Sequence, residues 1–449
     1  MGSPDGSGAP QEPAVEEAAR GRLAARSLRV ASSPLALAAG LVLGIQVATG
    51  VVRFATQVLF ARWGGPDQYG EYAYAFGWTT LLVIPATLGL TLSVLRYVPE
   101  YAHDERWALL RGLLRRSFQV TAVSGALFSA AGIGLVLVLG GSSEGPLLFG
   151  MALISVVSLV TLVREMTRGT QRVALAYGTG DLLPMTLALA IALGLAASGS
   201  LSGEEMLIAT GIGFLVALGV QWMVLRRSLP KAFSPVVRPS YDVRKWLTLS
   251  VPLWFVGIFT LVINQSDLLV LGALEAPAEV GVYAAGSKTA FLVSFVLVAV
   301  GAVLAPRIVR HHAAGDKVAL RNAVRSGTRL IMWPSVAVGG VLFLFPDIVL
   351  TAFGEGFEDS STILRILIVG QLFNAFAGPA GYVLLLTGAQ TTAAKVYGVA
   401  AAADVALLVT LVPAHGIQGA AVATATTIAV TNCVLYGIMR RRLAALPAG

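Results

Sequence analysis

Two basic side chains lie inside apolar runs of the sequence, where a charge is costly. Arg53 falls midway along the run 35–62, and Lys288 falls about two turns into the run 281–305. A charge at the centre of a bilayer costs about 2.5–3.5 kcal/mol on insertion scales, so both residues are candidates for function. Arg offers a bidentate fork and Lys a compact charge, and together they suit a diphosphate. The alternative is structural, in which they pair with acids such as Asp267 or extend toward a membrane interface.

Acids and amides form a second polar set inside apolar runs. Asn264, Gln265 and Asp267 lie close together in one run, and Asp404 lies in a later one. Carboxylates and amides are suitable ligands for Na⁺, and a buried carboxylate can instead carry a proton. Asn264, Asp267 and Asp404 are therefore candidates for binding a coupling ion. The alternative is that they form hydrogen bonds between helices.

The sequence offers little for metal-based or nucleophilic chemistry. It contains one cysteine, Cys433, and four histidines, so we expect neither a disulfide framework nor a metal site. The phosphate-binding motif GxxxxGK[ST] is missing, so any energy must come from an ion gradient or from the substrate's own gradient. The loops between apolar runs are too short to form a catalytic domain, and we expect no catalytic residue.

The elements that position these side chains are predicted to be transmembrane helices. The chain of 449 residues is 56% hydrophobic and only 12% charged, whereas soluble domains contain roughly 25% charged residues. Apolar runs of the length that crosses a bilayer, about 20 residues, recur between residues 35 and 439. We therefore predict an all-α polytopic membrane protein with about twelve transmembrane helices.

The charged residues predict the orientation of these helices. Most of the 32 Lys and Arg residues fall in alternate loops and in the two tails, whereas the intervening loops contain acids such as Glu204, Glu275 and Glu355. Basic loops remain in the cytoplasm, so both ends of the chain are predicted to be cytoplasmic, with the protein in the cytoplasmic (inner) membrane. The net charge of +8 is explained by this orientation, and we expect no nucleic-acid partner.

A weak internal repeat suggests how the helices are grouped. The segment 66–73 (PDQYGEYA) recurs as 277–284 (PAEVGVYA), and Arg96 corresponds to Arg307 at the same offset. An even number of predicted helices separates the copies, which makes the repeat parallel and predicts two six-helix bundles around a central cleft. Arg96 and Arg307 fall at cytoplasmic helix ends, where they are candidates for steering an anionic headgroup into the cleft. Topological anchoring is the alternative.

The predicted organisation has five parts. A disordered cytoplasmic tail (1–33), rich in Gly, Pro, Ala and Glu, precedes the N-terminal bundle (34–226). A cytoplasmic linker (227–246) then leads to the C-terminal bundle (247–439). A short cytoplasmic tail (440–449) ends the chain.

Five segments, taken in order, resemble motifs of one membrane protein superfamily. They are 51–66 (VVRFATQVLFARWGGP), 95–101 (LRYVPEY), 267–272 (DLLVLG), 280–288 (VGVYAAGSK) and 413–424 (PAHGIQGAAVAT). Together they resemble the multidrug/oligosaccharidyl-lipid/polysaccharide (MOP) exporter superfamily over most of the apolar part of the chain. Among its branches, the sequence is most similar to the polysaccharide transporters, which flip lipid-linked oligosaccharides.

The resemblance implies a flippase that moves a polyprenyl-diphosphate-linked oligosaccharide across the membrane by alternating access, for cell-surface polysaccharide assembly. It implies that Arg53 and Lys288 bind the diphosphate, and that partners include the bilayer and a polysaccharide polymerase or assembly machinery. It implies no cofactor other than Na⁺ or H⁺ as a coupling ion. Where the family often has two Asn residues four positions apart, this chain has Asp404 and Leu408, which departs from the pattern of an ion site.

Two other functions remain open from the sequence. A drug/cation antiporter of the same superfamily needs buried acids without opposing cations, and Arg53 and Lys288 oppose that reading. A membrane enzyme, such as a polymerase or ligase, needs a large external loop or a polar external constellation, and the sequence contains neither. The flippase is therefore the favoured hypothesis.

Overall fold

The computed structural model describes most of the chain, and its regular elements are helices. The described residues are 34–139, 144–197, 199–229, 233 and 238–445. The tail 1–33, which is predicted to be disordered, lies outside them. So do parts of the predicted linker and residues 446–449 of the predicted C-terminal tail.

The helices of the first half are long, and one bends sharply. The bend in α2 occurs at Gly65, whose φ of 71° lies in the left-handed region that favours glycine, directly before Pro66. A π-helical turn, η1, joins α6 to α7. The elements are α2 (Pro34–Thr87), α3 (Leu90–His103), α4 (Trp107–Leu139), α5 (Glu144–Gly169), α6 (Val173–Tyr177), η1 (Gly178–Leu182), α7 (Leu183–Ala196) and α8 (Gly203–Ser228).

The second half also consists of long helices, one of which bends at a glycine. Its last helix, α15, bends at Gly416, where φ is 55°. A break at Gly378 separates α13 from α14. The elements are α9 (Val243–Leu274), α10 (Pro277–Ala313), α11 (Lys317–Leu344), α12 (Pro346–Leu350), η2 (Thr351–Phe353), α13 (Ser360–Ala377), α14 (Ala380–Leu386) and α15 (Gln390–Ala445).

Length and composition make this a multi-pass membrane protein. Among the described residues, 10 helices are long and apolar enough to cross a bilayer. Two of them, with 48 and 55 residues, contain the bends at Gly65 and Gly416, and each is more than twice the length of about 20 residues that one crossing needs. Large apolar side chains on the outside, such as Val138 (83% exposed) and Val399 (72% exposed), provide a lipid-facing surface.

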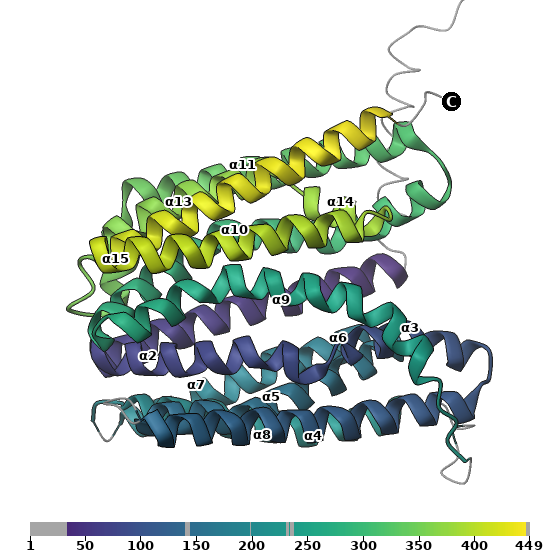
Figure 1. The fold of residues 1–449 in the computed structure, drawn as a ribbon, viewed down its shortest axis with the longest axis horizontal. Helices are drawn as coiled ribbons and strands as arrows, with labels where there is room; N and C mark the ends of the chain where they lie inside the picture. The colour runs from purple at the N-terminus through teal and green to yellow at the C-terminus, as the bar shows by residue number, and fades with distance from the viewer. Residues whose placement is uncertain (1–33, 140–143, 198, 230–232, 234–237, 446–449) are drawn as a thin grey trace, which may run out of the picture.

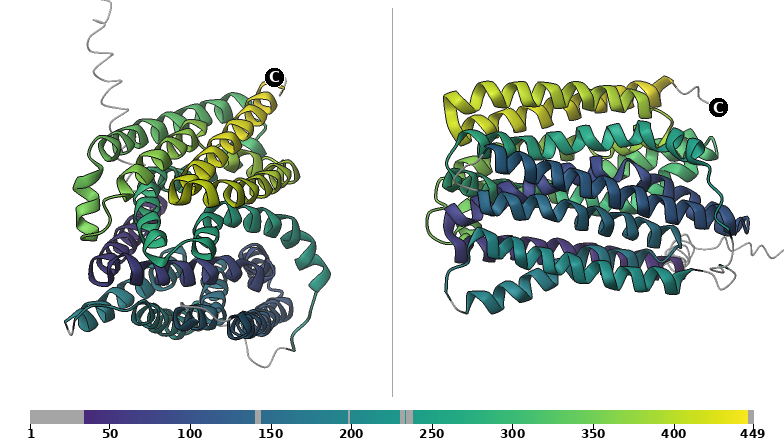
Figure 2. Two further views of the ribbon diagram at one scale, coloured as in Figure 1. Left: turned by 60° about the vertical axis from the view of Figure 1, so that its left-hand side comes forward. Right: turned by 60° about the horizontal axis from the view of Figure 1, so that its bottom comes forward.

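The helices lie side by side with their axes roughly aligned. Helices of the first half, coloured purple to teal, form the lower layer of Figure 1, and α10 to α15, coloured green to yellow, form the upper layer. Figure 2 shows the same two groups from other directions. Helix α9 packs against α15 on one side and against α2 and α3 on the other, so it lies at the boundary.

The two copies of the sequence repeat contact each other across this boundary. A Cβ atom added to Gly70 would lie 1.8 Å from the carbonyl oxygen of Pro277, and one added to Gly281 would lie 2.1 Å from that of Pro66. Only glycine allows helices to approach so closely. These four residues, which we term the glycine clasp, form a reciprocal contact between α2 and α10.

Hydrogen bonds fasten α3 to α9 elsewhere along the boundary. The hydroxyl of Ser93 donates to the carbonyl oxygen of Trp246 (2.8 Å), and the Trp246 indole donates to the hydroxyl of Tyr101 (3.0 Å). The Lys245 ammonium donates to the Glu100 carboxylate (3.1 Å), and this hydrogen bond raises the pKa of Lys245. We term this set of contacts the α3–α9 seam.

Candidate functional site

Arg53 lies deep in an apolar helix without a partner for its charge. It lies within a candidate membrane span and is separated from the bend at Gly65 by about 18 Å of helix. Its side chain is exposed. No hydrogen bond or ion pair joins it to another residue in the part of the chain that the structure describes. The guanidinium is therefore available to a ligand.

Lys288 lies near Arg53 on the neighbouring helix of the other half. Packing of Gly50 against the ring of Phe295 brings α2 close to α10 in this region. The half-buried Lys288 ammonium interacts electrostatically with two charges, attracted by Asp267 and repelled by Arg53. The structure thus brings Arg53 and Lys288, the two cations predicted to bind substrate, close together from opposite halves of the protein.

Asp267 does not cancel these two charges. Its carboxylate is buried, and it accepts hydrogen bonds from the Tyr283 hydroxyl (2.6 Å) and from the backbone N–H of Leu268 (2.8 Å). No ion pair joins it to Lys288 among the described residues. Two cations facing one carboxylate leave an excess of positive charge, which an anionic ligand can offset.

Asp404 belongs to a second polar group beside Asp267. One of its oxygens accepts a hydrogen bond from the Ser266 hydroxyl (2.5 Å). The other oxygen and the hydroxyl of Thr427 are buried without a hydrogen-bond partner within the described chain. Thr424 extends the group through its 3.5 Å contact with Tyr283. Carboxylate and hydroxyl oxygens are the ligands that hard cations prefer, and a buried carboxylate can also hold a proton.

The remaining candidates lie apart from these contacts. The amide of Asn264 is exposed and donates to the carbonyl oxygen of Thr260 in its own helix (2.6 Å). Arg96 is exposed on α3, with its guanidinium 6.0 Å from the centre of the Tyr97 ring. Arg307 is exposed on α10. A role for these side chains in binding stays a prediction.

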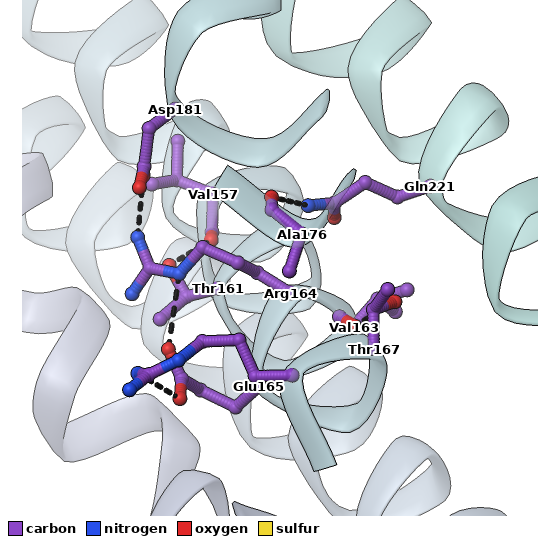
Figure 3. A network of polar contacts seen from close by, with 10 residues as sticks. Val157, Thr161, Val163, Arg164, Glu165, Thr167, Ala176, Asp181 and Gln221 are labelled. Carbon is purple, nitrogen blue, oxygen red and sulfur yellow. Dashed lines mark hydrogen bonds and ion pairs between the residues drawn. The ribbon is translucent and has the colours of Figure 1, made fainter. Parts of the chain in front are cut away.

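Sequence reasoning missed a network of partly buried charges in the first half, shown in Figure 3. Arg164 on α5 donates to Asp181 in η1 (2.5 Å) and to Glu165 (3.0 Å), and Arg168 donates to Glu165 (2.6 Å). Arg164 and Arg168 lie at the end of an apolar run, where basic residues are expected for orientation alone. The nearby acids Glu165 and Asp181 were the available signal. Because two cations balance two carboxylates, this network fastens helices and leaves no charge for a ligand.

Other hydroxyl and amide contacts between helices also escaped sequence reasoning. The hydroxyl of Tyr69 donates to Gln57 (2.9 Å), which links the two limbs of α2 across the bend. The amide of Asn374 donates to the hydroxyl of Ser294 (3.2 Å), which links α13 to α10. Neutral polar side chains are common where membrane helices pack, so the sequence does not mark these pairs. Among the described residues no group of three or more His, Cys, Asp or Glu could hold a metal ion.

Comparison with known proteins places this arrangement in context. Residues 38–312 match the family model described as polysaccharide biosynthesis protein, and residues 252–410 match the MatE model. No curated protein matches the chain. Both matched models belong with transporters and flippases of one superfamily, as the similar solved structures do.

Three of these structures illustrate the fold. A multidrug resistance MATE family transporter of the MOP superfamily, inward-facing, has a TM-score of 0.72 at 13% identity and covers 91% of this chain and 98% of its own. The lipid II flippase MurJ, in an inward closed conformation, has a TM-score of 0.69 at 14% identity. The match covers 90% of this chain and 89% of MurJ. A MOP superfamily transporter from Pyrococcus furiosus has a TM-score of 0.65 at 13% identity. The match covers 92% of this chain and 96% of that transporter. At these identities the likeness establishes the fold alone.

Proposed function

The chain belongs to the polysaccharide biosynthesis protein family within the MOP superfamily, and we propose that it flips a lipid-linked oligosaccharide across the cytoplasmic membrane. The lipid carrier is a polyprenyl diphosphate, and the oligosaccharide is destined for cell-surface polysaccharide. The observation that carries this proposal is the pair Arg53 and Lys288, two neighbouring cations in the membrane that have no ion-pair partner among the described residues.

The chemistry of the two cations fits a diphosphate. Unpaired charges in an apolar environment are costly, so such residues persist where a substrate or another charge compensates them. The guanidinium of Arg53 can bind two oxygens of one phosphate as a fork, and the Lys288 ammonium can bind the second phosphate as a point charge. Since Arg53 belongs to α2 and Lys288 to α10, one diphosphate would link the two halves of the protein.

The proposed transport cycle follows from the grouping of the helices. We assign about twelve crossings by counting the limbs of the bent helices α2 and α15 separately, with both chain ends in the cytoplasm. The bundles 34–226 and 247–439 would rock against each other, so that the site between them opens to one side at a time. Arg96 and Arg307 would attract the anionic headgroup toward the cytoplasmic opening. A polysaccharide polymerase or other assembly machinery would receive the product.

An ion gradient is the proposed source of energy. The oxygens of Asp267 and Asp404, with the neighbouring hydroxyls, offer a site for Na⁺ or a proton, and Asn264 lies one turn away on α9. Asp267 also interacts electrostatically with Lys288. A cation or proton bound at these carboxylates would change the field at Lys288 and therefore the affinity for the diphosphate.

The same buried acids favour a second candidate, a drug/cation antiporter of the superfamily. Asp267 and Asp404 could attract an organic cation, and the MatE model matches the segment that contains them both. The positions of Arg53 and Lys288 oppose this reading because two cations repel a cationic drug entering between the halves. The two functions therefore differ in the sign of the charge that the substrate must have.

Deletion of the gene tests the proposal. We expect lipid-linked repeat units to accumulate, measured by mass spectrometry, while surface polysaccharide is lost. The wild-type gene should restore the polymer, whereas Arg53→Ala and Lys288→Ala should not, at equal levels of protein in the membrane. Arg365→Ala is the matched control, because it also removes an exposed arginine from an apolar helix. Arg365 lies on α13, away from the proposed site, and donates to the carbonyl oxygen of Phe343 (3.2 Å).

Two results would contradict the flippase. One is unchanged glycolipids and polymer in the deletion strain, and the other is full complementation by Arg53→Ala. Increased sensitivity to cationic drugs, with normal polymer, would support the antiporter instead.

A further inference from the structure

A cavity of about 200 Å³ lies outside the proposed transport site, at one end of the second half. It is formed where α10 and α15 end and where α11 begins, with α14 as a further wall. Most of its lining is apolar, and two side chains at it can bind an anion. The lining includes Leu320, Val383, Thr387, Met439, His312 and Arg442.

The two basic side chains at the cavity have no partner within the described protein. Neither the imidazole of His312 nor the guanidinium of Arg442 has a hydrogen bond or ion pair with another residue that the structure describes. The wall beside Arg442 is held in place by Arg321, which donates two hydrogen bonds, of 2.5 and 2.9 Å, to the carbonyl oxygen of Leu443. These hydrogen bonds hold α15 against α11 beside the cavity, and the guanidinium of Arg442 remains available to a ligand.

The surface around the cavity is strongly positive. Within the segments 307–329, 387–396 and 439–445, the sole acidic residue is Asp316, and its carboxylate accepts a hydrogen bond from the N–H of Ala319 at the start of α11 (2.9 Å). The basic residues of these segments are Arg307, Arg310, Lys317, Arg321, Arg325, Arg329, Lys395, Arg440, Arg441 and Arg442.

Some cations of the first half have acidic partners. Arg106 pairs with Asp104 (3.2 Å), and Arg168 pairs with Glu165 (2.6 Å). Orientation in the membrane requires positive charge on both halves, but it does not require that one half lack acids. The guanidinium of Arg442 and the imidazole of His312, both at the cavity, can therefore bind an anion from outside the protein.

The basic side chains at the start of α11 lie along one face of that helix. Lys317, Arg321, Arg325 and Arg329 recur every four residues, which places them along one face of the helix. This basic face includes Arg321, whose neighbour Leu320 lines the cavity.

From these observations we propose that the cavity binds an anionic phospholipid of the adjacent leaflet. Arg442 and His312 would bind the phosphate, and the first part of one acyl chain would fill the apolar interior. The volume is below the roughly 300–1,000 Å³ of sites for drug-sized ligands, so it suits a single chain segment. The leaflet is cytoplasmic if the proposed orientation holds, but the binding itself does not depend on the transport function.

Native mass spectrometry of the full chain in detergent tests this proposal. The probes are dioleoylphosphatidylglycerol, which is anionic, and dioleoylphosphatidylcholine, which is zwitterionic. We expect the wild type to retain one molecule of the anionic lipid in preference. Because each Lys or Arg near an anionic lipid surface contributes about a fivefold factor, Arg442→Gln should weaken this binding about fivefold. Thr387→Phe, which fills the cavity and changes no charge, should also weaken it.

Two variants serve as controls. Arg227→Gln removes an exposed arginine from the end of α8 in the first half, and it should leave binding of the anionic lipid unchanged. Arg53→Ala should also leave it unchanged, which separates this site from the proposed transport site.

Three outcomes would overturn the proposal. The first is equal binding of the two lipids by the wild type, and the second is unchanged binding in both Arg442→Gln and Thr387→Phe. The third is displacement of the lipid by millimolar inorganic phosphate to the same extent in wild type and Thr387→Phe, since that would show an anion site without a place for the acyl chain.

Discussion

Substitution of Gly281 by alanine should weaken the contact between the two halves at the glycine clasp. The added Cβ would lie 2.1 Å from the carbonyl oxygen of Pro66, whereas carbon and oxygen normally approach to about 3.3–3.6 Å. Helices α2 and α10 must therefore separate by more than about 1 Å. The neighbouring atoms belong to the backbone and cannot turn aside as a side chain could.

The cost of this clash opposes a gain in helix propensity. Overpacking typically costs about 1–3 kcal/mol, and the replacement of a helical glycine by alanine gains up to about 1 kcal/mol. Because the obstacle at Gly281 is a backbone carbonyl, we expect the upper part of the cost range, with a net shift of about 2 kcal/mol toward the separated state. A change in coupling free energy of about 1–3 kcal/mol corresponds to roughly 5- to 150-fold in the equilibrium.

Thiol cross-linking measures this separation. Cysteines would replace Asp67 and Ala276, which adjoin the clasp on α2 and at the start of α10, in a Cys433→Ser background. A short bifunctional reagent should join them efficiently in the parent and poorly in Gly281→Ala. Gly340→Ala is the control, because an added Cβ there meets nothing within 4 Å. Equal cross-linking in the parent and in Gly281→Ala would refute the reasoning.

Three further outcomes are expected from other contacts. Arg164→Ala should lower the thermal stability of the purified protein, since it leaves Asp181 partly buried without its cation, and breaking such pairs costs about 3–5 kcal/mol; an unchanged melting temperature would contradict this. Asp404→Asn should make transport independent of Na⁺ and proton gradients, and transport that remains gradient-dependent would exclude Asp404 as the coupling site. The pKa of Lys245 is raised by its hydrogen bond to Glu100, so their attraction should be complete at neutral pH and be lost as the pH rises through that pKa; hydrogen exchange at the α3–α9 seam should increase there, and a constant rate across alkaline pH would argue against it.

The sequence was a good guide to helices and to the charges within them. Apolar length predicts α4, α5, α8 and α11 well, because a membrane span needs a run that few other structures contain. The bends at Gly65 and Gly416 and the break at Gly378 are harder to place, since glycine is also common in the interiors of packed membrane helices.

Contacts between helices were only partly predictable. The repeat predicted equivalent places for segments 66–73 and 277–284, but it gave no sign that Gly70 and Gly281 each meet the other copy's proline. The Ser266–Asp404 hydrogen bond joins α9 to α15 across 138 residues of sequence, and no periodicity identifies such a partner. The ion pairs of Arg164 were not predicted, because positive charges at helix ends are also what orientation requires.

Translocation by the purified protein tests the central claim most directly. The full chain would be reconstituted into liposomes with a polyprenyl-diphosphate-linked oligosaccharide, and exposure of the glycan to an added glycosidase would be followed over time. We expect wild-type protein and Arg365→Ala to expose the glycan of the inner leaflet, and Arg53→Ala and Lys288→Ala to leave it protected. Equal rates in all four proteins, or no translocation by the wild type, would contradict the proposal that these two cations bind the diphosphate of a lipid-linked substrate.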